Sequence, residues 1–269
     1  MIKVVVAGAA GRMGSRVINV LSSCEGILLS AAVERTGHPL LGQDVHCLAG
    51  IPSSEKSTII TDDLVTALKG GNVLIDFTAP EATLNHVKIC SDLGKPVVIG
   101  TTGFTKEQME TIYQYAQKIP CMLSPNMSIG INLCFRILSE IAKTIGNDYD
   151  MEIVEVHHHS KKDAPSATAI KMAQIIAQAV NRNLDEVGVY ARKGIIGERT
   201  KKEIGIQTLR AGDIIGEHTV MFAGTGERIE ITHRAHSRDT FAAGAARAVK
   251  WIISAKPGMY DMQDVLGLK

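Results

Sequence analysis

The sequence predicts an α/β protein in which a parallel sheet with crossover helices is joined to an α+β region with an antiparallel or mixed sheet. Two observations carry this prediction. In the first half, short β-branched runs alternate with amphipathic helical segments, as in a parallel sheet. After about Gly130, period-two alternation between glycine turns becomes common, which is typical of a sheet with one covered face.

The strand-like runs of the first half are short and end near glycine or polar residues. They are Ile2–Ala7, Ile27–Val33, Val73–Phe77 and Pro96–Ile99. Apolar residues at helical spacing predict helices from about Met13, from about Pro80 and over Lys106–Lys118. This order of strand, helix and strand predicts parallel pairing with right-handed crossovers.

The second half combines longer helices with alternating strands. Helices are expected at Asn132–Ile145, Thr168–Val180 and Thr240–Ser254. Strands are expected at Met151–Val156, Val187–Arg192, Ile204–Leu209, Glu217–Phe222 and Arg228–His233. No internal repeat or low-complexity linker interrupts this part of the chain.

Composition excludes several classes of protein. The chain has 269 residues, 45% of them hydrophobic and 21% charged, which is ordinary for a globular protein with a substantial core. Its formal net charge of +1 gives no general attraction to nucleic acid or anionic membranes. No apolar run is long enough to span a bilayer, and the N-terminus lacks a signal-peptide pattern.

The cysteines have no CxxC spacing and lie mostly among apolar residues. They are Cys24, Cys47, Cys90, Cys121 and Cys134. This usage predicts reduced core thiols in a cytoplasmic protein rather than disulfides or a metal site.

A glycine-rich turn follows the first strand and opens the first helix. Its residues are Gly8, Ala9, Ala10, Gly11, Arg12, Met13 and Gly14, with the spacing GxxGxxG. Glycines permit a tight turn and allow a pyrophosphate to approach the backbone N–H groups at a helix start. The turn therefore predicts dinucleotide binding, with a purely structural glycine turn as the alternative.

An acidic residue and a basic residue end the second strand. Glu34 follows Gly14 by about 20 residues, the spacing expected of a carboxylate that binds the cofactor's ribose. Arg35 could pair with the 2′-phosphate of NADP or could remain a solvated surface charge. Having both predicts use of NADH or NADPH. The segment Gly100, Thr101, Thr102 and Gly103 follows the fourth strand, where it forms either part of the ligand crevice or an ordinary turn.

The segment from Glu155 to Thr168 places three histidines and two lysines before a helix start. Imidazole and ammonium groups are the natural proton carriers near neutral pH. Pro165 and Ser166 predict that the first helical turn contains Ser166, Ala167 and Thr168, whose N–H groups and hydroxyls suit a carboxylate. The segment therefore predicts a catalytic or substrate-binding loop, with a solvated basic loop as the alternative. Adjacent histidines point in alternating directions, so no metal site is expected.

These motifs together resemble the 4-hydroxy-tetrahydrodipicolinate reductase family over nearly the whole chain. The resemblance is carried by the segments 6–14, 34–35, 76–78, 100–104, 157–168, 210–213 and 216–218. The family's loop typically reads E-x-H-H-x-x-K-x-D-A-P-S-G-T-A. Ala167 stands where that glycine usually does, and His159, Ser160 and Lys162 fill variable places.

The resemblance implies an NAD(P)H-dependent oxidoreductase of the diaminopimelate route to lysine, acting on a small cyclic dicarboxylate. It implies a Rossmann-like domain at 1–127 and 239–269, and a domain at 128–238 with an open mixed sheet that binds substrate and builds a homotetramer. His157 and Lys161 would be the proton-transfer pair, with Lys161 the favoured donor. The implied substrate contacts are His158, Ser166, Ala167 and Thr168. The implied cofactor contacts are Gly8, Ala9, Ala10, Gly11, Arg12, Met13, Glu34, Arg35, Gly100, Thr101, Thr102, Ser124, Pro125, Asn126 and Met127.

Two other functions share part of this pattern. Another small-substrate dehydrogenase, of the amino-acid or aspartate type, would need the glycine turn but not the loop from His157 to Thr168. A redox sensor that binds NAD(P) without turnover would usually carry an added DNA-binding or partner segment. The near-neutral charge and the absence of an added module argue against the sensor.

Overall fold

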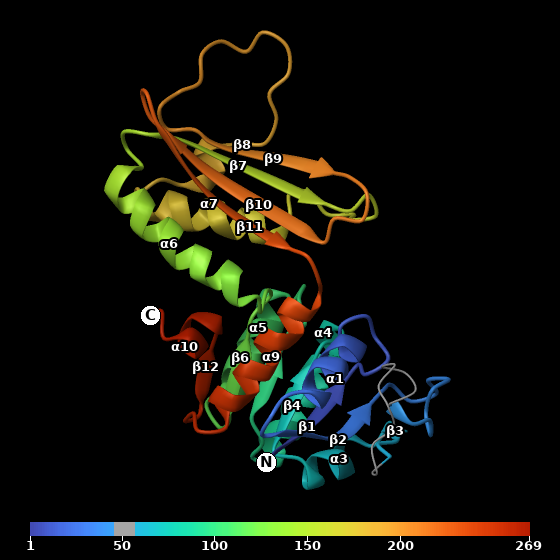
Figure 1. Ribbon diagram of the computed structural model, residues 1–269. Coiled ribbons are helices and arrows are strands. Elements are labelled where there is room, and N and C mark those ends of the chain that lie inside the picture. The colour runs from blue at the N-terminus through green and yellow to red at the C-terminus, as the bar shows by residue number, and fades with distance from the viewer. Residues whose placement is uncertain (46–56) are drawn as a thin grey trace. The chain divides into compact units, whose positions relative to one another are not determined.

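The computed structural model describes residues 1–45 and 57–269. It separates into two compact units (Figure 1). Unit 1 contains Met1–Ile129 and Arg238–Lys269, and unit 2 contains Gly130–Ser237. The chain therefore builds most of unit 1, passes through unit 2 and returns to complete unit 1.

A seven-stranded parallel sheet forms the centre of unit 1. Its strands are β1 (Ile2–Ala7), β2 (Ile27–Val33), β3 (Ile60–Thr61), β4 (Val73–Asp76), β5 (Val97–Ile99), β6 (Pro120–Leu123) and β12 (Gly258–Tyr260). They pair in the order β12-β6-β5-β4-β1-β2-β3. The order reverses at β1, which lies between β2 and β4. In open parallel sheets such a reversal leaves a crevice at the carboxyl ends of the strands.

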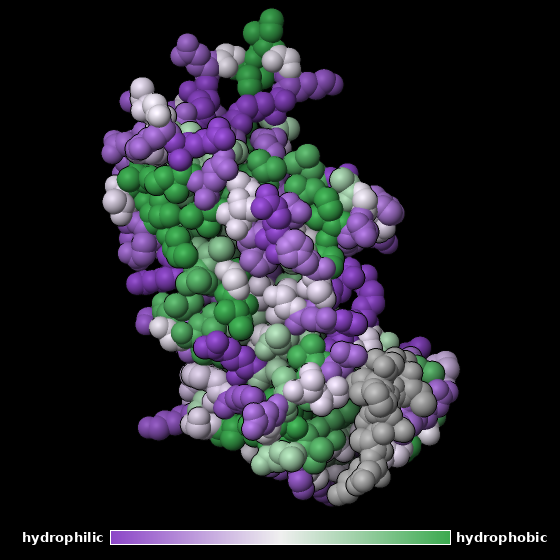
Figure 2. Space-filling view, viewed as in Figure 1, coloured by the Kyte–Doolittle hydropathy of each residue, from purple (hydrophilic) through white to green (hydrophobic). Residues whose placement is uncertain are grey.

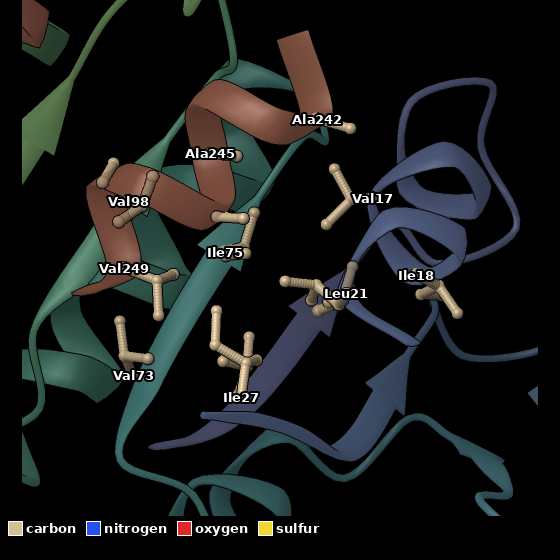
Figure 3. Packing of buried hydrophobic residues seen from close by; sticks show 14 of the residues in the cluster. Val17, Ile18, Leu21, Ile27, Val73, Ile75, Val98, Ala242, Ala245 and Val249 are labelled. Carbon is tan, nitrogen blue, oxygen red and sulfur yellow. The ribbon is translucent and has the colours of Figure 1, made fainter. Parts of the chain in front are cut away.

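Helices cover both faces of this sheet. One face is covered by α1 (Gly14–Ser22), α9 (Asp239–Ile252) and α10 (Met262–Leu266), and the other by α3 (Leu64–Gly70), α4 (Pro80–Asp92) and α5 (Lys106–Ala116). Figure 3 shows Val17 and Leu21 of α1 pointing toward Ile75 of β4 and Val249 of α9. All four are at most 1% exposed, so α9, which follows unit 2 in the chain, is part of the core of unit 1.

Unit 2 is a five-stranded mixed sheet with two helices on one face (Figure 1). Its elements are α6 (Ile129–Ile145), β7 (Asp150–His157), α7 (Ala167–Ala179), α8 (Leu184–Val187), β8 (Gly188–Val189), β9 (Ile204–Arg210), β10 (Gly216–Ala223) and β11 (Arg228–Ala235). The strand order is β11-β10-β7-β9-β8; β9 runs parallel to β7 and β8, and the other pairs are antiparallel.

Strict alternation along β7 explains why the helices cover only one face. Met151, Ile153, Glu155 and His157 are buried on the side of α6 and α7, whereas the residues between them are only partly buried. Side chains of a strand alternate between faces, so one apolar set fills the core. At its carboxyl end, however, the buried set becomes charged and polar.

The fold class expected from the sequence is confirmed by the parallel sheet of unit 1 and the mixed sheet of unit 2. Of the strand expected at Val187–Arg192, only Gly188–Val189 forms, as β8. Val187 instead ends the helical turn α8, which starts after Asn183, whose Oδ1 accepts a hydrogen bond from the Asp185 N–H. Among the described residues, six short elements were not foreseen, namely β3, α3, β6, α8, β12 and α10. Such short segments carry too few periods to be recognised.

The described cysteines have reduced thiols. Cys90 and Cys121 are buried, and Cys24 and Cys134 are partly buried. Burial raises the pKa of the Cys121 thiol to about 12, so this thiol stays protonated and inert at neutral pH. Cys47 lies outside the described residues.

Candidate functional site

The glycine turn of unit 1 is built by backbone that leaves no room for side chains. Gly8 follows β1 with φ +73°, and a Cβ there would lie 2.9 Å from the Phe77 carbonyl oxygen. A Cβ on Gly14, the first residue of α1, would lie 2.0 Å from the Gly8 carbonyl oxygen. The turn is closed by the Gly11 N–H, which donates to the Gly8 carbonyl oxygen at 3.0 Å. Glycine is therefore required sterically at Gly8 and Gly14.

The start of α1 can accept an anion. No side chain of the described part caps this helix at Met13, and the Ser15 N–H donates to the Gly11 carbonyl oxygen at 3.1 Å. The start of the helix is therefore not closed by a side chain, as an anion site at a helix N-terminus requires. Arg12 is exposed beside it, Ala10 is partly buried, and Ala9 is fully buried in the core. Ala9 and Ala10 therefore shape the turn through their backbone.

Glu34 follows β2 and lies against the same turn. Its Oε1 accepts a hydrogen bond from the Ala10 N–H at 2.8 Å. Glu34 and Arg35 both line a pocket of about 580 Å³ that also reaches Gly8 and Gly11. The structure thus brings the glycine turn, the acidic residue and the basic residue together at one cavity.

The opposite wall of this pocket comes from β4 and α4. Thr78 and His86 line it. His86 is joined through Nδ1 to Oδ2 of the fully buried Asp76 at 2.8 Å, and the Thr78 hydroxyl donates to Oδ1 of Asp76 at 2.6 Å. Sequence reasoning assigned no role to His86, because a single histidine in an amphipathic helix carries no distinguishing signal. Only its proximity to Asp76 identifies it.

The loop after β5 lies at the same edge of the sheet. A Cβ on Gly100 would lie 2.0 Å from the Phe77 ring, so this glycine makes space for an aromatic side chain. Thr101 is 4% exposed, and its hydroxyl accepts hydrogen bonds from the Thr78 N–H at 3.0 Å and the Thr83 hydroxyl at 2.9 Å. Thr102 is exposed. Gly100 and Thr101 therefore support Phe77 and Thr78, and any ligand contact from Gly100 is through its backbone.

The loop after β6 is held by its own polar groups. The Ser124 hydroxyl donates to the Asn126 carbonyl oxygen at 2.8 Å, and the Ser128 N–H donates to Oδ1 of Asn126 at 2.9 Å. Pro125 is exposed. Met127 is 1% exposed and belongs to the core cluster beneath α9, so its side chain has a packing role.

In unit 2, the loop after β7 ends at the start of α7. Ser166 is the N-cap of this helix, and its Oγ accepts from the Ala169 N–H at 3.2 Å. Ala167 and Thr168 are the first two helical residues, the former exposed and the latter partly buried. The first helical turn was expected to contain Ser166, but Ser166 is the N-cap and the helix begins one residue later, at Ala167. Ala167 has a helical backbone, so its methyl group is compatible with this position.

Lys161 and its neighbours form the exposed part of this loop. The side chain of Lys161 is 21% exposed, and Nζ lies 2.9 Å from Oδ1 of Asp163. His158 is partly buried and His159 is exposed. Nδ1 of His159 lies 2.9 Å from the Gly212 carbonyl oxygen, which ties the loop to the segment after β9. The ammonium group is therefore held near the loop surface.

His157, in contrast, is buried among charged and polar groups. It is 8% exposed, and its Nδ1 lies 2.5 Å from Oε2 of Glu155. Glu155 also accepts two hydrogen bonds from Arg210 and one from the Ser166 N–H, all at 3.0 Å. Burial alone would raise the pKa of the Glu155 carboxyl, but the hydrogen bonds from His157, Arg210 and Ser166 lower it to about 2. Glu155 is therefore ionised at neutral pH.

His218 of β10 completes this cluster. It is 4% exposed, its ring meets that of His157 edge-to-face at 5.2 Å, and its Nε2 lies 3.0 Å from the Ser166 hydroxyl. Burial, followed by the charge of His157, lowers the pKa of His218 to about 3. The cluster thus holds a neutral imidazole next to one that faces a carboxylate.

Two searches of the described ranges, 1–45 and 57–269, gave negative results. No group of three or more His, Cys, Asp or Glu side chains there is arranged to hold a metal ion. No helix in those ranges is both long and apolar enough to cross a membrane.

Two family models match the chain. The one described as dihydrodipicolinate reductase, N-terminus, matches residues 2–127, and the one described as dihydrodipicolinate reductase, C-terminus, matches residues 130–266. The two matches together cover nearly the whole chain.

Curated relatives match over their full length. The 4-hydroxy-tetrahydrodipicolinate reductases of Syntrophus aciditrophicus and Geotalea daltonii are 53% and 55% identical over 269 residues, which is 100% of each chain.

Among solved structures, a dipicolinate-bound dihydrodipicolinate reductase from Paenisporosarcina sp. TG-14 matches with a TM-score of 0.75 and 26% identity, covering 98% of this chain and 99% of that one. An amine dehydrogenase from Mycobacterium smegmatis, at 13% identity and a TM-score of 0.60, shares the fold alone.

Proposed function

Because the chain belongs to the dihydrodipicolinate reductase family, we propose that it reduces 4-hydroxy-tetrahydrodipicolinate to tetrahydrodipicolinate with NAD(P)H, in diaminopimelate and lysine biosynthesis. The protein is an NAD(P)H-dependent oxidoreductase. The geometric observation that supports this substrate is the loop of unit 2, in which His157 and Lys161 precede the capped start of α7 within a single segment. A general small-substrate dehydrogenase would not need that arrangement.

Unit 1 holds the cofactor in this proposal. The turn at Gly8 and Gly14 is closed to side chains, which suits a pyrophosphate that approaches backbone N–H groups. When bound, the dihydronicotinamide supplies the hydride. Glu34 would accept hydrogen bonds from the ribose hydroxyls of NADH, and Arg35 would pair with the 2′-phosphate of NADPH. The enzyme would therefore use either cofactor. The loops Gly100–Thr102 and Ser124–Met127 contribute mainly backbone.

The Arg35→Ala variant tests this assignment. It should weaken NADPH more than NADH, because a charge-assisted contact is worth roughly 1.5–3 kcal/mol. Titration of both cofactors by fluorescence measures the difference. Equal effects on the two cofactors would remove Arg35 from the phosphate site.

The start of α7 binds the substrate's carboxylate. Its N–H groups at Ala167 and Thr168 and the positive end of the helix dipole favour an anion. His158 and Ser166 complete the seat. The solved relative from Paenisporosarcina sp. TG-14 carries dipicolinate, a planar dicarboxylate of this size. We therefore expect pyridine-2,6-dicarboxylate to compete with substrate.

Lys161 and His157 move the protons. Loss of water and gain of hydride and a proton convert the substrate into tetrahydrodipicolinate. A ring nitrogen becomes basic once the hydride has arrived, and the Lys161 ammonium donates a proton to it. Asp163, at 2.9 Å, holds the ammonium in place. His157, whose Nδ1 faces Glu155, exchanges protons with Lys161 or the substrate through its other ring nitrogen, Nε2.

We also propose a homotetramer built by the sheet of unit 2. The face of this sheet opposite α6 and α7 has no covering helix among the elements the structure describes, and Ile229 of β11 is 40% exposed. Ile195 and Ile196 are exposed in the loop between β8 and β9, and Figure 2 shows hydrophobic surface at its tip. Apolar surface of this kind is typical of an interface. Light scattering should give about four times 28.9 kDa, and a clean monomer would contradict the proposal.

The decisive experiment measures turnover. Pyruvate and aspartate semialdehyde, condensed in situ, supply the substrate, and the decrease in NADH or NADPH absorbance reports reduction. Oxidation of aspartate with NAD⁺ instead would indicate an aspartate dehydrogenase. Cofactor binding without turnover would indicate a sensor.

We further propose that the enzyme works in the cytoplasm, where reducing conditions keep thiols such as Cys90 unpaired.

A further inference from the structure

Glu155 is a completely buried carboxylate that lies beside the proposed site without belonging to it. It is 0% exposed and is located on β7, two residues before His157. A buried charge is costly unless it is paired and fully hydrogen-bonded. Its four hydrogen bonds, one shared with His157, two from Arg210 and one from the Ser166 N–H, meet this requirement.

These partners lie at the two ends of the proposed catalytic loop. His157 is the last residue of β7, and Ser166 is the N-cap of α7. The parallel register of β7 and β9 places Arg210 opposite His157, and Arg210 also donates to the Asp163 carbonyl oxygen at 2.7 Å. One carboxylate and one guanidinium therefore fix the beginning, the end and one interior point of the segment that carries His158 and Lys161.

The same carboxylate determines which imidazole nitrogen of His157 carries the proton. An ionised carboxylate is only an acceptor, so the Nδ1 that faces Oε2 of Glu155 at 2.5 Å must be the donor. Nε2 is then the nitrogen that can take up or release a proton. Its side of the ring lies against Gly216, where a Cβ would be 3.0 Å from Nε2, so the glycine leaves the imidazole room.

We propose that Glu155 is a positioning residue for the reduction: it keeps His157 protonated at Nδ1 and joins the two ends of the loop that carries Lys161 and the carboxylate seat. This inference rests on the proposed function of that loop. The ionised state of Glu155 that it requires agrees with the lowered pKa of the carboxyl, about 2. Carboxylates that orient the histidine ligands of metal sites typically contribute roughly 10- to 100-fold in activity, and we expect a loss of the same order here.

Glu152 provides a matched control on the same strand. It also accepts two hydrogen bonds from an arginine, Arg192, at 2.9 and 2.8 Å. It lies on the other face of β7 and pairs with Arg192 and Arg199, neither of which belongs to the loop from His157 to Ser166. Glu152→Gln therefore removes the same kind of carboxylate–arginine pair without touching the proposed catalytic groups.

The kinetic test compares Glu155→Gln with Glu152→Gln. Glu155→Gln should lower kcat by roughly 10- to 100-fold with little change in NADH affinity, whereas Glu152→Gln should keep kcat near the wild-type value. In a His157→Gln background, Glu155→Gln should cost much less, because the two residues act as one unit. Equal kcat losses for the two glutamine variants, or full additivity with His157→Gln, would overturn the proposal.

A spectroscopic test is independent of turnover. Long-range ¹H–¹⁵N spectra of the protein without cofactor or substrate, assigned with His157→Gln, should show the wild-type ring protonated at Nδ1. Glu155→Gln presents an amide donor there and should shift the ring toward protonation at Nε2. An unchanged tautomer would contradict the proposal. If the wild type fails to reduce the substrate, the proposed function fails, while this measurement still decides the role of Glu155.

Glu155→Asp covers the case in which the glutamine variant does not fold. It keeps the charge but shortens the side chain, so it should retain the Nδ1-protonated ring and lose less kcat than His157→Gln. A folded Glu155→Asp protein that keeps the Nδ1-protonated ring but loses as much kcat as His157→Gln would overturn the positioning role.

Discussion

The glycine turn of unit 1 and the loop of unit 2 prepare their sites in opposite ways. The turn is built from backbone, and its requirement is the absence of side chains at Gly8 and Gly14. The loop is built from side chains, and it depends on the buried charges of Glu155 and Arg210. A backbone site of this kind is identified by its local sequence, and the packing of Phe77 and the Glu34 carboxylate then complete it. A site of buried ionised groups needs every partner in place, because an unpaired buried charge is strongly destabilising.

The largest expected effect comes from removing the proposed proton carriers of unit 2. Lys161→Met and His157→Gln should each lower kcat by roughly 10²- to 10⁴-fold while NADH binding stays nearly intact, because a positioned acid or base contributes that much. Steady-state kinetics and cofactor titration measure the two effects separately.

Lys162→Met is the matched control, since it removes an adjacent exposed ammonium group. A large loss of NADH affinity in the Lys161 or His157 variant would move that residue to the cofactor side of the comparison, and near-normal kcat would exclude it from catalysis.

Acid should destabilise unit 2 first. The folded pKa of Glu155, about 2, lies below its ordinary value of 4.5, so its stabilisation is complete above pH 4.5 and is lost as the pH falls toward 2. The folded pKa of His218, about 3, lies below its ordinary value of 6.5. As the pH falls from 6.5 to 3, the unfolded chain therefore binds a proton at this residue that the folded chain does not, and the folded state loses stability. The Glu155 contribution alone is about 3 kcal/mol.

Hydrogen exchange measures this difference region by region. Between pH 7 and pH 3, amide protection corrected for intrinsic exchange should fall in β7 and β10 more than in β1 and β4. His218→Gln should flatten the pH dependence of unit 2. A parallel decline in both units would contradict the assignment to this cluster.

An added methyl group should be costly at the start of α1, whereas the start of α7 already carries one at Ala167. Gly14→Ala forces a Cβ to within 2.0 Å of the Gly8 carbonyl oxygen, so the turn must shift, at a cost of about 1–3 kcal/mol, and cofactor affinity should fall. Denaturant titration and NADH binding measure the two effects.

Gly70→Ala is the control, because a Cβ at the end of α3 meets nothing within 4 Å. Equal stability of the two variants would show that the turn of unit 1 is less confined than its geometry indicates.

The smallest effect is expected at the start of α7. Ala167 already has a helical backbone, so Ala167→Gly should destabilise unit 2 by only about 0.4–1 kcal/mol, through the greater freedom of the unfolded chain. Inhibition by pyridine-2,6-dicarboxylate should change little, because the backbone N–H remains.

Thr168→Val should weaken that inhibition by removing a hydroxyl donor. A large gain in inhibitor affinity and turnover for Ala167→Gly would show that the methyl group impairs the seat.

Local patterns predicted most of the fold. Ile27–Val33 was predicted with the bounds that the structure shows, because a short, mostly apolar run bounded by glycine and charge has few alternatives. The bounds of α6 and of the alanine-rich helix α9 were predicted to within a few residues. The strand expected at Val187–Arg192 is shorter in the structure. The Asn183 cap starts a helical turn that includes Val187, and Tyr190 and Ala191 are exposed with little to pack against.

The glycine turn could likewise be described from the sequence, since Gly8 and Glu34 follow the strands β1 and β2 and Gly14 opens the helix between them. The pairing of His86 with Asp76 could not, because a helix position and a strand end become neighbours only after α4 packs on the sheet. The role of Met127 was also hidden, because its burial beneath α9 depends on a segment more than a hundred residues away.

The amino-acid sequence by itself determined the fold class, the glycine turn and, to within one residue, the start of the helix after Pro165, because each depends mainly on interactions among residues close in the chain. Only the tertiary structure decided which groups surround His157. Glu155, Arg210 and His218 lie on three strands, and their contacts follow from the register of β7 with β9 and β10. A shift of that register by one residue would turn these side chains to the other face of the sheet. The cluster therefore exists only once the whole of unit 2 has folded.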